Sequence, residues 1–253
     1  MNSTFNIQHS TLLEVCSGSI ISAINAQEGG AHRIELCDNL NEGGTTPSAG
    51  TIMIVTKKLT IPVFVLIRPR TGDFLYSAEE FEVMKQDIRF CKEHSAEGVV
   101  VGILKEDGSV DMERMKELVD LARPMQVTFH RAFDMTADPF RALEDIISLG
   151  IERILTSGQA PNAMAGANLI QQLNHRAANR IIIMPGGGIT EHNIAALNKI
   201  TGSTEVHGSL RSKITSRMIF RNDATSMGNI GDQEFDWMET DVERVRRILL
   251  ELK

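Results

Sequence analysis

The chain has 253 residues, of which 42% are hydrophobic, 23% charged and 5% aromatic, and its formal net charge is −7. This length and balance predict a folded protein with a large core, and they exclude disordered, collagen-like and disulfide-scaffold chains. The negative charge and the scarcity of aromatic side chains argue against a nucleic-acid-binding surface, which needs a basic patch and stacking rings.

The N-terminus and the cysteines indicate where the protein works. Residues 1–7 contain neither a basic stretch nor an apolar run, so we expect no signal peptide. The longest apolar run, residues 61–67, ends at Arg68 and is far shorter than the roughly 18 residues that span a bilayer. Three cysteines, an odd number, are typical of reduced thiols. We therefore expect a cytoplasmic protein whose partner is a metal ion or a small anionic molecule, not a nucleic acid or a membrane.

Short runs of strand-forming residues alternate with amphipathic segments along nearly the whole chain. Eight runs predict strands, over residues 12–16, 33–37, 63–67, 98–101, 126–130, 153–156, 181–184 and 205–207. Helical spacing between them predicts helices over residues 77–93, 112–122, 138–149, 163–173 and 191–199, with a short one inside residues 45–60. Such alternation is typical of parallel βαβ units, and eight units predict an α/β protein with a (β/α)8 TIM barrel over about residues 11–210.

A doubly wound sheet is the alternative architecture. It predicts a Gly-rich dinucleotide fingerprint after the first strand, and the segment Cys16-Ser-Gly-Ser lacks that spacing. Asp138 and Pro139 also mark a helix start where the barrel needs one, as a cap and as the first helical residue. The barrel is therefore the favoured fold.

Residues 211–236 do not follow the alternation. They are polar, contain Gly228 and Gly231, and precede an amphipathic helix predicted over residues 240–252. A segment within them, residues 216–220, predicts an additional strand or hairpin. Long irregular segments are usually functional, and both a subunit contact and a lid remain open. We expect residues 1–253 to form a single domain, in which residues 211–253 are a C-terminal arm and helix.

Alternation within each strand predicts which side chains point into the barrel. The face that meets the helices must be apolar, so polar residues of the other parity point inward. This places ten residues inside, near the C-terminal halves of their strands: Glu14, Cys16, Glu35, Cys37, Arg68, Thr128, His130, Thr156, Glu205 and His207. Active sites of these barrels lie at that end. Buried charges must either pair with one another or serve a ligand, and both interpretations remain open.

Cys16 and Cys37 end two similar segments, Leu13-Glu-Val-Cys and Ile34-Glu-Leu-Cys. Equivalent positions on adjacent strands predict a separation of about 5 Å. Two thiolates at that distance suit Cu(I), which prefers sulfur ligands, although free cysteines also pack as small hydrophobic residues. Cys91 lies in a predicted helix, and we expect it to pack there.

Small residues follow the last strands. Gly186, Gly187 and Gly188 come after the seventh strand, Ser209 after the eighth and Ser157 after the sixth. Backbone N–H groups of such turns bind phosphate in many TIM barrels, so we expect an anion site there, with a simple tight turn as the alternative.

A polar barrel mouth suits catalysis as well as metal binding. If the protein is an enzyme, we expect Glu14, Glu35, Arg68 and His130 to be catalytic, with Arg68 holding an anion and His130 or Glu35 transferring a proton. The substrate would then be a small anionic or phosphorylated metabolite, with no role for copper.

At these residues the sequence resembles the CutC family of copper homeostasis proteins. The matching segments are residues 13–16, 33–37, 43–48, 68–76, 130–134, 155–158 and 186–188, which extend over most of the chain. The resemblance implies a cytoplasmic TIM barrel that forms homo-oligomers, with a dimer favoured. It also implies a role in copper homeostasis, with Cu(I) bound by Cys16 and Cys37.

Overall fold

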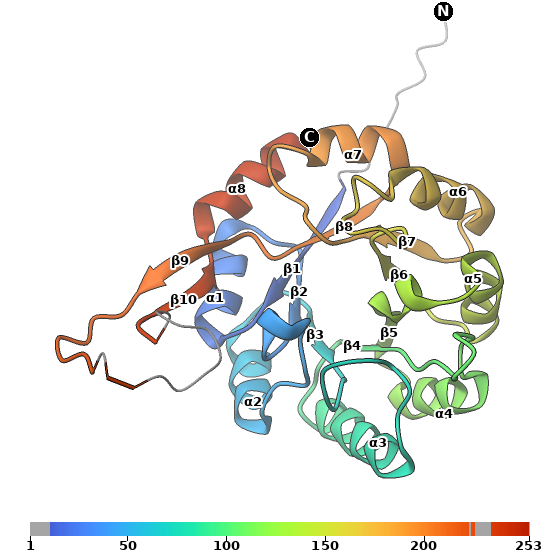
Figure 1. Cartoon of the computed structure of the whole chain (residues 1–253), viewed down its shortest axis with the longest axis horizontal. Coiled ribbons are helices and arrows are strands. Elements are labelled where there is room, and N and C mark those ends of the chain that lie inside the picture. Colours follow the sequence, from blue (N-terminus) through green and yellow to red (C-terminus); the bar gives the residue numbers. More distant parts are fainter. Residues whose placement is uncertain (1–10, 223, 226–233, 253) are drawn as a thin grey trace, which may run out of the picture.

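The computed structural model describes residues 11–222, 224–225 and 234–252, and within them eight parallel strands form a barrel (Figure 1). The strands are β1 (Leu12–Ser17), β2 (Arg33–Leu36), β3 (Val63–Leu66), β4 (Gly98–Val101), β5 (Gln126–Phe129), β6 (Arg153–Thr156), β7 (Ile182–Pro185) and β8 (Glu205–Gly208). Hydrogen bonds join them in the order β7-β6-β5-β4-β3-β2-β1-β8. Because β7 and β8 lie beside each other, the circle is nearly closed. The predicted (β/α)8 TIM barrel is confirmed.

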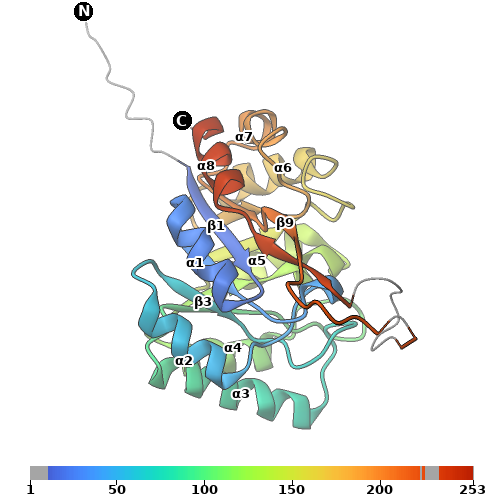
Figure 2. The same ribbon diagram turned by 90° about the vertical axis from the view of Figure 1, so that its left-hand side faces the viewer.

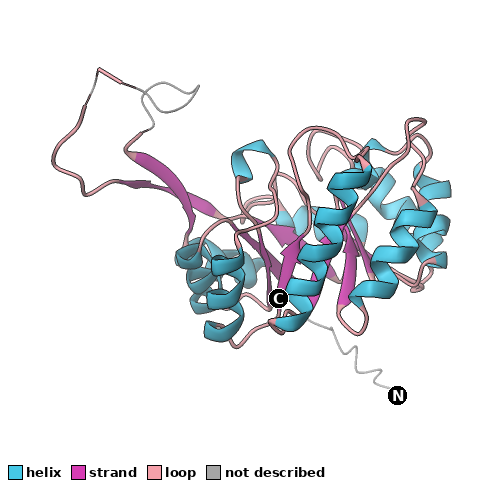
Figure 3. Cartoon of the chain, turned by 90° about the horizontal axis from the view of Figure 1, so that it is seen from below, coloured by secondary structure: helices cyan, strands magenta, loops and turns pink. Residues whose placement is uncertain are grey.

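Helices surround the barrel (Figures 1 and 3). They are α1 (Ile20–Gly29), α2 (Ala49–Lys58), α3 (Ala78–Glu93), α4 (Met112–Ala122), α5 (Pro139–Ser148), α6 (Ala167–Ala177), α7 (Ile194–Thr201) and α8 (Val242–Glu251), with 3-10 helices at Leu40–Glu42 and Arg131–Met135. Among the described residues, no helix is long and apolar enough to cross a membrane.

Helix starts follow local chemistry. The Asp138 side chain accepts hydrogen bonds from the amides of Phe140 and Arg141, with Pro139 next in the chain, as predicted. Helix α6 begins at Ala167 rather than at residue 163. The reason is a close backbone contact, because a side chain on Gly166 would overlap the backbone of Ser157 and Gly158. The chain before α6 therefore folds as a tight loop.

Helix α8 completes the ring between α7 and α1, and Figure 2 shows it beside α7. Its Val245 and Ile248 are fully buried. A side chain on Gly29 would overlap Val245, so glycine at this position allows the last turn of α1 to approach α8 closely. The C-terminal helix is thus part of the barrel's outer layer.

The segment between β8 and α8 forms an antiparallel hairpin that projects from the barrel (Figure 3). Its strands are β9 (Arg211–Thr215) and β10 (Asp236–Thr240). The prediction of a hairpin was right, but the prediction of a strand over residues 216–220 was wrong. Pairing ends at Thr215 and Asp236, so the following residues have no partner strand. Gly228, Gly231 and residues 1–7 lie outside the described residues.

Two separate apolar regions stabilise the fold. The larger one fills the space between the strands and the helices. The smaller one lies inside the barrel and consists of Cys16, Cys37, Phe64, Leu66 and Val100. Cys91 belongs to the larger region, in α3, as predicted. The sheet therefore separates Cys16 and Cys37, which lie inside the barrel, from Cys91, which lies between the sheet and the helices.

Candidate functional site

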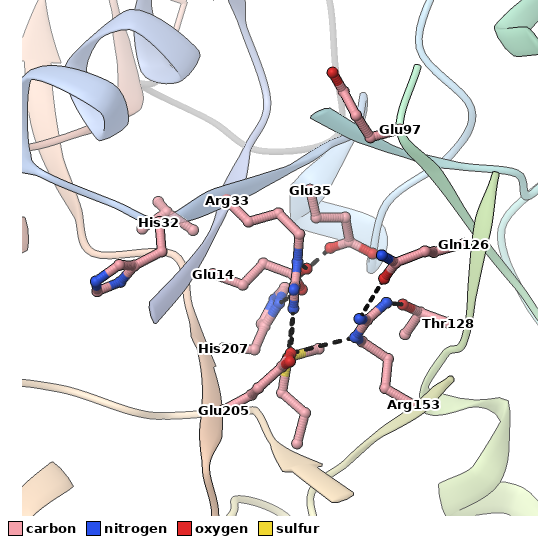
Figure 4. A network of polar contacts seen from close by, with 12 residues as sticks. Glu14, His32, Arg33, Glu35, Glu97, Gln126, Thr128, Arg153, Glu205 and His207 are labelled. Atoms are coloured by element: carbon pink, nitrogen blue, oxygen red, sulfur yellow. Dashed lines mark hydrogen bonds and ion pairs between the residues drawn. The ribbon is translucent and has the colours of Figure 1, made fainter. Parts of the chain in front are cut away.

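Ion pairs occupy the middle of the barrel (Figure 4). Arg33 lies between two carboxylates, with Nε 2.5 Å from Glu14 Oε2 and Nη2 2.5 Å from Glu205 Oε2. Arg153 Nε reaches the same Glu205 oxygen at 3.2 Å, and its Nη2 donates to Gln126 Oε1 at 2.6 Å. These charges balance one another, so part of the predicted polar interior is a structural ion-pair network.

Sequence reasoning missed Arg33 and Arg153 as inward residues. Both stand at the first position of a strand, where alternation can be followed on one side only. The available signal was parity, because Arg33 lies two residues before the inward Glu35. Glu205 is also the first residue of its strand, so the expected position in the C-terminal half of β8 was wrong.

Thr156 was expected inside the barrel, and the structure places it on the other face of β6. Its hydroxyl donates to Asp134 Oδ1 at 2.5 Å and accepts from the amide of Gly158. Leu155 instead lines the cavity at the mouth. The polarity of Thr156 suggested that it points into the barrel. A buried threonine can instead face the helices when a carboxylate from a loop accepts a hydrogen bond from its hydroxyl.

Cys16 and Cys37 come together at the mouth, with their Sγ atoms 3.5 Å apart. Their positions are not level, because Cys16 is the register partner of Glu35 and Ser17 that of Leu36. The expected side-by-side alignment was therefore wrong by two residues, a stagger that strand tilt in a barrel requires. The side chains still meet diagonally. Both are buried free thiols.

The two thiols differ in acidity. The hydrogen bond with Cys37, assisted by His207, lowers the pKa of Cys16 to about 5. Burial, and then the neighbouring Cys16 thiolate, raise the pKa of Cys37 well above its usual value. Burial also raises the pKa of Glu35, and the charge of Cys16 adds to the effect. At neutral pH the Cys16 thiolate accepts a hydrogen bond from the Cys37 thiol, and burial disfavours ionisation of the Glu35 carboxyl beside them.

His207 connects the thiols to the ion pairs below them. Its Nδ1 is 2.8 Å from Glu14 Oε1, and its Nε2 is 3.7 Å from Glu35 Oε2. Burial disfavours the imidazolium, but hydrogen bonds with Cys16 and Glu14 outweigh it and raise the pKa of His207. Burial opposes the ionised form of Glu14 too, yet Arg33 and His207 lower the pKa of Glu14 to about 2. These contacts therefore favour the imidazolium form of His207 beside the Cys16 thiol.

Cys16, Glu35 and Cys37 offer a compact set of metal donors. One ligand atom from each lies within 4.8 Å of the others, and all three residues are buried. Two sulfur atoms and one carboxyl oxygen form a donor set in which the soft atoms dominate, which suits a soft ion.

A cavity of about 110 Å³ opens at the mouth above these donors. Cys16, Glu35 and His207 line it together with Arg68 and His130. The structure therefore brings Glu35, Arg68, His130 and both cysteines to one place, as expected. Glu14 lies deeper and is held by Arg33.

Ser157, one of the residues expected to bind an anion, lies in the loop after β6. The amides of Ser157 and Gln159 donate to the Asp134 carboxylate at 3.0 and 3.1 Å, and Arg131 Nη2 donates to Ser157 Oγ at 2.8 Å. This loop therefore holds a carboxylate of the chain itself.

The glycine turn and Ser209 have different surroundings. Gly187 and Gly188 adopt left-handed conformations, with φ of 100° and 71°. A side chain on Gly186 would overlap Leu155. Ser209 lies where the chain leaves β8 for the hairpin, and its carbonyl accepts from Thr240 Oγ1 at 3.5 Å. The turn is thus built for close packing at the mouth.

Comparison with known proteins gives consistent matches. The CutC family model matches residues 11–212. The chain is 52% identical over 238 residues to the copper homeostasis protein cutC homolog of Mus musculus, covering 94% of this chain and 88% of that protein. It is 51% identical over 238 residues to the Homo sapiens homolog, covering 94% and 87%. The crystal structure of CutC from Streptococcus agalactiae has a TM-score of 0.76 at 34% identity, covering 79% of this chain and 98% of that one.

Proposed function

The chain belongs to the CutC family, and we propose that it is a copper homeostasis protein that binds Cu(I) through Cys16 and Cys37. The observation that carries this proposal is the distance of 3.5 Å between the two Sγ atoms. One small ion can contact both atoms without a change of backbone. Cu(I) is the ion for which thiolate pairs are best suited among common biological metals.

The acidity of the two thiols supports uptake of a soft cation. Cys16 is a thiolate at neutral pH, because its pKa is lowered to about 5. Cys37 keeps its proton until the ion arrives. The Glu35 carboxyl is the third donor of the cluster and completes the coordination. All three groups are buried, so a bound ion would have little contact with bulk water.

The proposal is tested by titrating the reduced protein with Cu(I) in the presence of a chromophoric competing chelator, without oxygen. We expect each chain to bind about one equivalent of Cu(I) tightly, because two neighbouring thiolates suit a single soft ion. Cys16→Ser and Cys37→Ser should each abolish it, whereas Cys91→Ser, which removes a buried thiol in α3, should leave it unchanged. Tight binding by the Cys16→Ser/Cys37→Ser protein would overturn the proposal.

We also propose that the protein works in the cytoplasm as a homodimer. Free thiols at positions 16, 37 and 91 fit a reducing compartment. The hairpin region exposes Ile219, Phe220 and Trp237, which suits self-association. Sedimentation of the wild-type chain beside Phe220→Asp tests this. A monomer at micromolar concentration in the wild type would contradict it.

A further inference from the structure

We propose that the cavity at the barrel mouth binds the carboxylate of a small organic acid through Arg68 and His130, independently of Cu(I). Both residues line the cavity, and their side chains come from the ends of different strands. This inference goes beyond copper binding and does not depend on it.

Arg68 is a buried cation with no counter-ion. It is 6% exposed. Its Nη1 donates to the carbonyl of Gly44 at 2.7 Å and Nη2 to that of Gly72 at 2.7 Å, while the Phe74 ring lies 5.1 Å away. Among the described residues, no carboxylate lies within ion-pair distance of it. The guanidinium is therefore held rigidly by neutral groups.

The other buried arginines of the barrel make the contrast clear. Arg33 pairs with Glu14 and Glu205, and Arg153 pairs with Glu205. A buried charge without a partner is strongly unfavourable. Arg68 lines an open cavity, so a dissolved anion can supply the missing charge. Arg68 also acts on the buried Tyr76 hydroxyl, which is a neutral group and leaves the guanidinium charge uncompensated.

His130 adds a directed donor. Its Nδ1 accepts a hydrogen bond from the amide of Ala132 at 3.1 Å, so the ring proton resides on Nε2. That nitrogen is buried and has no partner within the described residues. Burial and the charge of Arg68 lower the pKa of His130 to about 3, so the ring is neutral and donates one hydrogen bond. A side chain at position 102 would overlap the His130 ring, so Gly102 leaves the space that the ring occupies.

The size of the cavity selects the ligand. An apolar cavity of about 150 Å³ holds benzene, which has six non-hydrogen atoms. The cavity of about 110 Å³ therefore suits a group of similar size or smaller, such as lactate or pyruvate. The amides of Ser157 and Gln159, which would suit a phosphate group, already bind Asp134. Because Arg68 Nη1 donates to the carbonyls of Gly44 and Glu42 and Nη2 to that of Gly72, a carboxylate would accept from the remaining Nη2 proton and from His130 Nε2.

The test is a binding measurement on the metal-free full chain, by ligand-observed NMR and calorimetry. The probes are lactate and pyruvate, with lactamide as the neutral isostere and inorganic phosphate as the competing anion. We expect lactate or pyruvate to bind at least ten-fold more tightly than lactamide and phosphate. Equal binding of lactate and lactamide, preference for phosphate, or no binding of either acid would overturn the proposal.

Variants assign the site to its residues. Arg68→Gln should weaken lactate binding at least ten-fold, which is typical of a lost charge-assisted hydrogen bond. Arg70→Gln is the matched control, since Arg70 lies in the same loop but pairs with Asp73 and Glu80, and it should change binding less than two-fold. If Arg68→Gln does not fold, His130→Phe decides, with an expected loss of about three- to ten-fold. Unchanged binding in His130→Phe would exclude this geometry.

The cysteines separate this inference from the copper proposal. Cys16 and Cys37 also line the cavity, but neither is a proposed contact of the carboxylate, so the Cys16→Ser/Cys37→Ser protein should keep lactate binding within about two-fold while losing Cu(I). Lactate binding that disappears with the thiols would overturn the independence of the two sites. Failure of Cu(I) binding in the wild type, with lactate binding intact, would leave the carboxylate site supported.

Discussion

His207 Nδ1 and Glu14 Oε1 are 2.8 Å apart, although the two residues are separated by 193 positions in the sequence. Strands β1 and β8 are paired so that Glu14 and His207 are register partners. The contact joins the ion pairs in the middle of the barrel to the thiol pair at its mouth. A change in either layer is therefore transmitted to the other through one imidazole ring.

Cu(I) binding should release about one proton at pH 7, because the ligand thiols must be deprotonated. Cys16 is already a thiolate, and Cys37 carries the proton that is lost. Calorimetric titrations in buffers of different ionisation enthalpy measure this number. Release of about two protons would contradict this count and show that a second ligand group, the Cys16 thiol or the Glu35 carboxyl, also loses a proton.

Alkylation of Cys16 by iodoacetamide should already be fast at pH 6, since the thiolate is the reactive form and the pKa of Cys16 is lowered to about 5. His207→Gln should raise the pH at which the reaction reaches half its maximal rate. Peptide mapping by mass spectrometry identifies the modified residue. Cys91, whose pKa burial raises to about 12, serves as the internal control and should remain unmodified in the folded protein.

Acid should destabilise the protein through Glu14. The pKa of Glu14 is about 2 in the folded protein and 4.5 in the unfolded chain, so the ionised form of Glu14 favours folding. This contribution, about 3 kcal/mol, is fully present above pH 4.5 and is lost as the pH falls toward 2. Urea unfolding between pH 7 and pH 3 measures the loss. A stability profile in Glu14→Gln as steep as that of the wild type would contradict this role.

Arg33→Met should lower the free energy of unfolding by about 3–5 kcal/mol, because it removes the buried cation that bridges Glu14 and Glu205 and leaves them only His207 and Arg153. Arg180→Met is the control, because it makes the same substitution in an ion pair at the surface. Arg180 pairs with Glu144 there, and their side chains are 45% and 37% exposed, respectively. An exposed pair contributes at most about 1 kcal/mol. Urea denaturation at pH 7 compares the two. Equal losses of unfolding free energy in the two variants would show that Arg33 stabilises the protein no more than an exposed ion pair does.

Gly29→Ala should destabilise the protein by about 1–3 kcal/mol, as expected for overpacking, since the added methyl group would overlap Val245. Val245→Gly in the same chain removes both clashing carbons, Cβ and Cγ1, so the loss caused by Gly29→Ala should be smaller in that background. Thermal unfolding of the two single variants and the double variant gives the coupling. Simple additivity would mean that α1 and α8 can move apart without cost.

Periodicity could predict much of the fold and of the site, because strand alternation is local. It placed Glu35 and His207 inside the barrel, because Ile34 and Leu36 flank Glu35 and Val206 precedes His207, which fixes their parity. It could not predict the stagger between β1 and β2, which the closure of the whole barrel determines. Arg153 went unrecognised for a related reason, because its partner Glu205 is 52 residues away and no local pattern links them.

Asp134 gives the loop after β6 a ligand that cannot diffuse away. Its carboxylate accepts from the amides of Ser157 and Gln159 and from the hydroxyl of Thr156. A group tethered in this way acts at an effective concentration in the millimolar range or above. A dissolved phosphate ester at micromolar concentration would have to displace this tethered carboxylate to reach the same amides.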